Sequence, residues 1–171
     1  MFSSTTRRVA AGAAAVAGAL SLGLGTTSAS AADDDTTAAV LRCTGPVSFT
    51  VNVSTGAVFG GGNLRCTVAG TPFVTSAALT VLAGSATASG GFVRTTTLDR
   101  LLYNTGEETS VSAVRDYTNL GSGTLETGRG SAVGGRFTPS RYSDAGVGST
   151  TQAGTLRTFS LSQYTLTLNV P

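Results

Sequence analysis

Apolar and polar residues alternate along most of the chain beyond residue 39, with the period of two that is typical of half-buried β-strands. The clearest stretch is 47–53 (VSFTVNV), and shorter stretches of the same kind recur as far as the last residues. Glycine-containing clusters such as 54–56 and 89–91 separate them, as turns do. No long segment has the period of an amphipathic helix. The pattern therefore predicts an all-β fold, an antiparallel β-sandwich or a small barrel of short strands.

Three segments depart from this alternation. Residues 57–59 are predicted to form a short strand that ends in a glycine turn at 60–63. The leucines of 98–103 have helical spacing, and Thr97 is a candidate N-cap, so a helical turn is expected there. Residues 119–154 are rich in glycine and poor in large apolar side chains, which predicts long loops or mobile hairpins with short strands at 124–127 and 136–138.

Two changes of phase predict β-bulges or strand breaks. Val74 and Leu79 fall on opposite parities within one apolar stretch. Near the C-terminus, the apolar parity that includes Leu161 gives way to the one that includes Tyr164, which predicts a bulge at 162–163. The last strand is expected to tie the C-terminus into a sheet.

The first 31 residues have the pattern of a secretory signal peptide. Arg7 and Arg8 precede a run without charged residues at 9–24, and Ala29 and Ala31 supply small side chains at the cleavage positions. A transmembrane anchor is the alternative, but the run is shorter than the ~20 residues that span a bilayer. A twin-arginine leader is a second alternative, although the bulky apolar pair such leaders usually carry is missing.

The signal defines the domain organisation and the compartment. Behind it we expect a polar stub at 32–38 and a single β-rich domain at 39–171. A domain of this length buries roughly two-thirds of its unfolded surface, so it needs no second core. Signal removal predicts a secreted, extracellular protein without a transmembrane segment.

The only two cysteines, Cys43 and Cys66, are predicted to form one disulfide, because an even count in an exported chain is typical of one. Closing a loop of this length stabilises the fold by ~3–3.5 kcal/mol in the chain-entropy model. Each cysteine lies in the same tetrapeptide, LRCT, at 41–44 and 64–67. If the two tetrapeptides form neighbouring strands, Leu and Cys face one core, and Arg and Thr face outward.

The charge balance excludes several partners and chemistries. All basic side chains are arginine, and outside the signal nine arginines face nine acidic residues, so no nucleic-acid partner is expected. The chain has no His and no Lys, which excludes Ser-His-Asp and Cys-His catalysis, Schiff-base chemistry and imidazole metal sites. We expect no cofactor and no metal. Six carboxylates remain as candidates for acid–base chemistry: Asp99, Glu107, Glu108, Asp116, Glu126 and Asp144.

We therefore expect a secreted, non-enzymatic binding protein, such as an adaptor or structural component of an extracellular assembly. Its partner is expected to be another secreted or cell-surface protein. Arginine and tyrosine anchor many interfaces, and they gather in two stretches that give a candidate binding surface: Arg94, Arg100, Tyr103, Arg115, Tyr117, Arg136, Arg141 and Tyr142. The alternatives are a secreted protease inhibitor, a carboxylate-dependent hydrolase and a membrane-acting toxin component.

Overall fold

The computed structural model describes residues 40–70, 72–121 and 123–169. The predicted signal peptide and polar stub lie outside the described residues. Within this part of the chain every regular element is a strand. The strands are β1 (Val40–Asn52), β2 (Val58–Val68), β3 (Ser76–Ser89), β4 (Phe92–Tyr103), β5 (Glu108–Asn119), β6 (Thr124–Gly135), β7 (Ser140–Ala153) and β8 (Leu156–Asn169).

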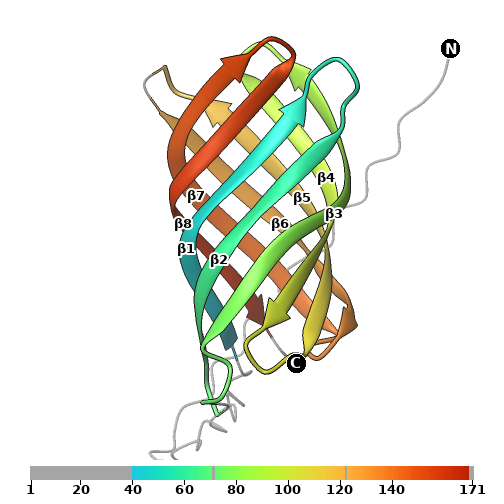
Figure 1. Ribbon diagram of the computed structural model, residues 1–171, viewed down its shortest axis with the longest axis vertical. Coiled ribbons are helices and arrows are strands. Elements are labelled where there is room, and N and C mark those ends of the chain that lie inside the picture. Colours follow the sequence, from blue (N-terminus) through green and yellow to red (C-terminus); the bar gives the residue numbers. More distant parts are fainter. Residues whose placement is uncertain (1–39, 71, 122, 170–171) are drawn as a thin grey trace, which may run out of the picture. The chain divides into compact units, whose positions relative to one another are not determined.

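The eight strands form a closed antiparallel barrel in sequence order (Figure 1). Each strand pairs with the next, and β8 pairs with β1 from Val40–Asn169 to Asn52–Leu156. This last pairing excludes the sandwich that was one of the two predicted architectures, because a sandwich leaves sheet edges that closure removes. The barrel alternative is correct, but the prediction of short strands is wrong, because the eight strands are 11–14 residues long. No helix among the described residues has the length and apolar character to cross a membrane.

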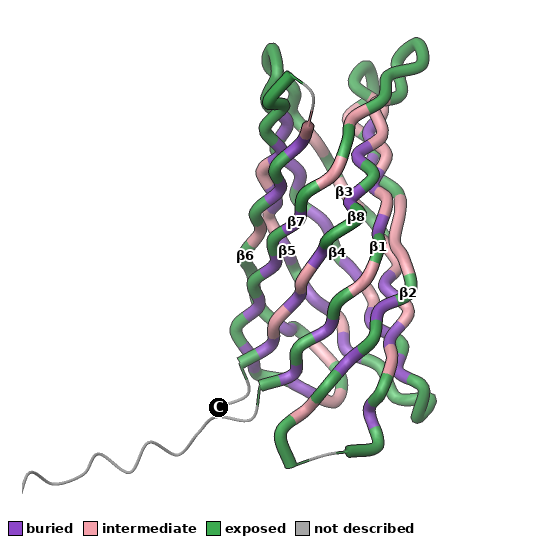
Figure 2. The backbone as a smooth tube through the Cα atoms, turned by 90° about the vertical axis from the view of Figure 1, so that its left-hand side faces the viewer, coloured by how far each residue is buried: buried purple, intermediate pink, exposed green. Residues whose placement is uncertain are grey.

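The period-two pattern places alternate side chains inside the barrel, and buried and exposed positions alternate along the strands (Figure 2). Aromatic rings fill much of the interior. Tyr117 stacks on Phe159 with ring centroids 4.2 Å apart, and Phe49 lies 6.1 Å from Tyr117 and 6.2 Å from Tyr164. The core is therefore a packed column of side chains rather than an open channel.

Two predicted irregular segments are strands. Residues 98–103 belong to β4, where Asp99, Leu101 and Tyr103 are buried and the residues between them point outward. The helical prediction was wrong because it grouped the inward Leu101 with the outward Leu98 and Leu102 and ignored the buried aspartate. Residues 119–154 contain the whole of β6 and β7, which pair as a hairpin rather than forming long loops. The predicted strand at 124–127 begins β6, whereas the predicted strand at 136–138 is the turn before β7. Their inward positions hold glycine and polar residues, so no apolar alternation marks them.

The predicted turn at 60–63 is also wrong, because β2 continues through it. Gly60 and Gly61 have φ values of 148° and 152°, which favour glycine. A Cβ on Gly61 would collide with the carbonyl oxygen of Leu79 on β3. Glycine here lets three strands approach closely rather than turning the chain.

The predicted change of phase near Leu161 and Tyr164 corresponds to a β-bulge, whereas the one between Val74 and Leu79 falls where β3 begins. Leu161 and Tyr164 are buried while Ser162 and Gln163 are exposed, and the register of β8 shifts at this place against both neighbours. In β3 the register against β4 shifts between Val81 and Ala83, beyond the predicted position.

The predicted disulfide is confirmed. Cys43 and Cys66 are directly opposite each other on β1 and β2, with their Cα atoms 4.0 Å apart, and both are buried. Arg42 and Arg65, the arginines of the repeated tetrapeptide, point outward as the pattern predicted.

Candidate functional site

A buried polar cluster surrounds Arg115 of β5 inside the barrel. The Arg115 Nε donates to Asp144 Oδ2 at 2.6 Å, and Nη2 donates to Asp99 Oδ2 at 2.6 Å. Nη1 donates to Thr97 Oγ1 at 2.8 Å, and Nη2 also donates to the Tyr142 hydroxyl at 2.5 Å. One guanidinium thereby links strands β4, β5 and β7 through four of its five N–H groups.

A glycine on β6 leaves the space in which Arg115 and Asp144 can pair. Gly128 pairs with Arg115 on one side and with Asp144 on the other, so it lies between the two in the sheet. A Cβ at Gly128 would collide with the Asp144 carboxylate and would lie 3.0 Å from Arg115 Cγ. The guanidinium reaches Asp144 across β6 because residue 128 has no side chain.

Aromatic side chains complete the cluster. The Tyr164 hydroxyl donates to Asp144 Oδ2 at 2.6 Å, and Tyr142 donates to the same oxygen. The Phe49 ring lies 4.8 Å from the Arg115 guanidinium carbon, in a cation–π arrangement. Burial raises the pKa values of the Tyr142 and Tyr164 hydroxyls well above their ordinary range, so both are neutral donors.

Glu126 is the third carboxyl group beside Arg115, with its Oε1 3.8 Å from Arg115 Nε. Burial, followed by the charge of Asp144, raises the pKa of Glu126 to about 9, and Arg115 opposes this only in part. Neither Glu126 oxygen has a hydrogen-bond partner among the described protein atoms. Because a buried carboxylate without partners is costly, Glu126 holds a proton at neutral pH.

The cluster is closed to solvent, since the exposed fractions of the Arg115, Asp99, Glu126 and Asp144 side chains are at most 1%. A ligand outside the barrel cannot reach these groups in this structure. The cluster has the geometry of a polar core that fixes the positions of several strands.

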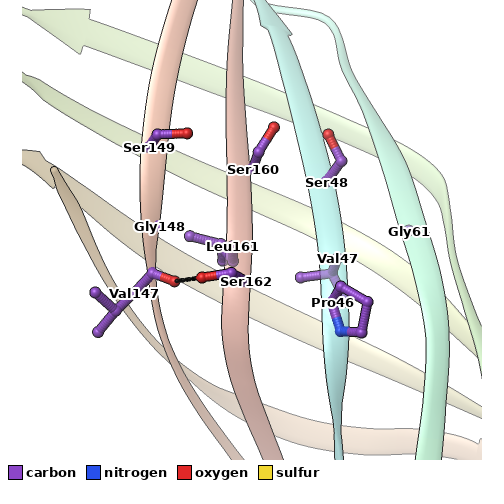
Figure 3. A pocket seen from close by; sticks show the side chains of 10 residues that line it. All are labelled: Pro46, Val47, Ser48, Gly61, Val147, Gly148, Ser149, Ser160, Leu161 and Ser162. Atoms are coloured by element: carbon purple, nitrogen blue, oxygen red, sulfur yellow. Dashed lines mark hydrogen bonds between the residues drawn. The ribbon is translucent and has the colours of Figure 1, made fainter.

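A groove lies on the outer face formed by β7, β8, β1 and β2 (Figure 3). We call it the serine groove. It has a volume of about 680 Å³, and it is lined by Pro46, Val47, Ser48, Gly61, Val147, Gly148, Ser149, Ser160, Leu161 and Ser162. Ser149, Ser160 and Ser48 form one cross-strand row, because Ser160 pairs with both of the others. Strand spacing separates successive serines of this row by ~4.8 Å. No charged and no aromatic residue lines the groove.

The bulges explain why a groove exists on an otherwise regular sheet. The β1–β8 register shifts between Gly45 and Val47, and the β7–β8 register shifts between Val147 and Gly148. Bulges bend strands and leave residues outside the ladder. Pro46, which has no N–H to donate, is accommodated at one of these bulges.

The face that carries the groove has no exposed carboxylate. Asp144, the only acidic residue in β7, β8, β1 and β2, points into the barrel and is buried. The same strands carry four arginines outside the core: Arg42, Arg65, Arg141 and Arg157. In the described part of the chain, three of the six acidic residues lie inside the barrel, whereas eight of the nine arginines lie outside the core.

Comparisons with protein-family models, with curated proteins and with solved structures give no match. The function of this face must therefore be inferred from its own residues and geometry.

The structure divides the candidate binding surface predicted from the sequence into two groups. Tyr103, Arg115, Tyr117 and Tyr142 are buried in the barrel, at 3% exposure or less, and cannot contact a partner on its outer surface. Their inward position follows from strand parity, because each shares its parity with the core residues of β4, β5 or β7.

The other four predicted residues lie outside the core, on different parts of the barrel. Arg94 pairs with Asp116 at 2.6 Å, and Arg136 of the β6–β7 turn pairs with Glu107. Arg100 lies on β4, which is four strands away from β8 around the closed barrel. Of the predicted set, Arg141 alone lies on the same face as the serine groove.

Sequence reasoning missed the groove and the arginines beside it. The serines are too common in this chain to stand out, and Ser48 lies more than 100 positions before the other two serines of the row. For Arg42 and Arg65 a signal existed, because the LRCT repeat placed both outward on neighbouring strands.

Proposed function

We propose that this protein is an extracellular binding protein without catalytic activity, and that it binds a cell-surface or matrix component through the outer face of β7, β8, β1 and β2. The observation that carries the proposal is the serine groove, a hollow lined by hydroxyls and apolar atoms on a face without exposed carboxylates. Four serine hydroxyls supply donors and acceptors, and the closed barrel holds them on rigid strands, which limits the entropy lost on binding.

The interior cluster supports a non-enzymatic role. Its carboxylates contact Arg115 and neighbouring side chains, and they are sealed from solvent. The expectation of a protein partner stays a prediction, and the groove also suits a polymer that carries hydroxyl groups.

A carboxylate-dependent hydrolase is the second candidate, because three carboxyl groups meet around Arg115 and the pKa of Glu126 is raised. If the chain has hydrolytic activity from this cluster, Asp99→Asn should abolish the activity while the fold is retained. An activity that survives this change would exclude the cluster as its source.

The proposal can be tested with a fluorescent reporter, since the chain has no tryptophan. Phe59→Trp places one beside the groove, on an outward position of β2 that pairs with Thr50. Phe92→Trp is the matched control on β4. Both variants would be titrated with the secreted-protein and polysaccharide fractions of the producing culture.

We expect one fraction to change the emission of Phe59→Trp and to leave Phe92→Trp unchanged. Adding Ser160→Tyr, which fills the groove from an exposed position, should abolish the response without changing the far-ultraviolet circular dichroism. If neither fraction changes the emission of Phe59→Trp, or if both reporters respond equally, the proposed binding face is wrong.

A further inference from the structure

Three exposed arginines lie on the same face as the serine groove, toward the end of the barrel where β1 begins and β8 ends. We call Arg42, Arg65 and Arg141 the arginine strip. None of them forms an ion pair with a carboxylate among the described residues. Arg100, Arg129 and Arg157 also lack such a pair, whereas Arg94 and Arg136 are partnered by Asp116 and Glu107. The strip is distinguished because its three arginines lie together on a face without an exposed carboxylate.

The strand register places the three arginines of the strip along one diagonal of the sheet. Arg42 pairs with Thr67, and Arg65 pairs with Thr44, so the two arginines are diagonal neighbours on β1 and β2. Residues in this relation lie ~7–8 Å apart. Arg141 lies farther along the same diagonal, because it pairs with Asn169 of β8 and that residue pairs with the first residue of β1.

The surroundings of the strip are neutral and rich in hydroxyls. The cross-strand neighbours of its three arginines are serine, threonine and asparagine residues: Ser76, Thr44, Thr67, Thr167, Ser131 and Asn169. The serine groove continues this surface toward the middle of the same strands. A ligand that follows the strands would meet charge at one end and uncharged hydroxyls at the other.

We propose that the partner of this face is an anionic polysaccharide. Its carboxylate or phosphate groups pair with the arginine strip, and its neutral sugar hydroxyls hydrogen-bond in the serine groove. Guanidinium groups bind both kinds of anion through paired N–H donors, and serine hydroxyls match sugar hydroxyls as donors and acceptors. This inference rests on the proposed function, whose binding face it uses.

The same observations disfavour a nucleic acid. Proteins that bind single strands usually stack successive bases on several aromatic side chains, and Phe59 is the only exposed aromatic residue in β7, β8, β1 and β2. Affinity for the polysaccharide is therefore expected to come from charge and hydrogen bonds, and to fall with salt.

The test compares two triple variants of the full chain that remove the same formal charge. The strip variant is Arg42→Gln, Arg65→Gln and Arg141→Gln. The control variant is Arg94→Gln, Arg100→Gln and Arg136→Gln, which leaves the strip intact. Binding would be measured by calorimetry against polygalacturonate (carboxylate), phosphorylated dextran (phosphate), neutral dextran and a short DNA duplex.

We expect wild type to bind polygalacturonate, phosphorylated dextran or both, with the two polymers identifying which anion is preferred. The strip variant should bind at least about tenfold more weakly, and the control variant should stay close to wild type. Removing three contacts with a linear polyanion should also lower the slope of log affinity against log salt by about 2–3.

Four results would overturn the inference. They are equal losses in both triple variants, dextran binding as tight as polyanion binding, tighter binding of DNA through the same arginines, and no binding of either polyanion. The Phe59→Trp titration separates these results from a failure of the proposed function. If a culture fraction changes its emission while the polyanions do not bind, the face is a binding site for another partner.

Discussion

Glu126→Gln should flatten the dependence of stability on pH. The glutamine amide is close in shape to the protonated carboxyl group that Glu126 presents inside the barrel, and it cannot ionise. In the wild type the pKa of Glu126 is about 9 in the fold, against an ordinary value of 4.5. The unfolded chain therefore releases this proton far below the pH at which the folded barrel does.

Proton linkage determines whether Glu126 stabilises or destabilises the fold as pH rises. A carboxyl group whose pKa is raised in the fold stabilises it fully below its unfolded pKa, and this contribution is lost as pH rises toward the folded value. Each pH unit in this window costs about 1.4 kcal/mol for one proton. Between pH 5.5 and 8.5 the wild type should lose about 4 kcal/mol through Glu126, and the variant should not.

The assay is urea unfolding of both proteins at half-unit pH steps, followed by far-ultraviolet circular dichroism. The free energy of unfolding of Glu126→Gln minus that of wild type should rise steadily across the window. Glu108→Gln, which removes an exposed carboxylate outside the cluster, is the control and should follow wild type. Parallel profiles for wild type and Glu126→Gln would show that Glu126 is ionised in the fold, and would refute the description of the cluster.

Three further predictions concern stability, each measured by urea unfolding. Gly128→Ala should destabilise the barrel by roughly 1–3 kcal/mol, because its Cβ would displace the Asp144 carboxylate, whereas Gly134→Ala, whose Cβ lies 3.9 Å from its nearest neighbour, should have little effect. Arg115→Leu should cost roughly 3–5 kcal/mol by leaving buried carboxylates without their counter-charge, while Arg94→Leu, at an exposed pair, should change little. Replacing Cys43 and Cys66 by alanine should cost about 3 kcal/mol, and an unchanged stability would contradict the assigned role of the disulfide.

The β class, the disulfide and the bulge at 162–163 were predictable because each has a local signal. Alternation marks β1 and β8, which carry apolar residues at their inward positions. It fails in β4 and β6, where Asp99, Glu126 and Gly128 occupy inward positions and break the apolar pattern. These positions form the buried cluster, so the strands that hold it were the hardest to predict.

Closure of the barrel and the binding face depend on pairings that the sequence does not reveal. The β1–β8 ladder joins residues such as Ser48 and Ser160, and no local pattern indicates which distant strands will pair. The charge balance also depends on the fold, since a near-neutral total conceals acidic residues inside and arginines outside. An expectation drawn from net charge alone therefore missed the basic face.

The binding face is best located by backbone-amide chemical-shift mapping of the ¹⁵N-labelled protein during titration with polygalacturonate or phosphorylated dextran. We expect shifts that saturate and are confined to β7, β8, β1 and β2, with the largest near Ser48, Ser160 and Arg42. Shifts centred on β4 and β5, or on the residues around Arg115, would contradict the proposed binding face.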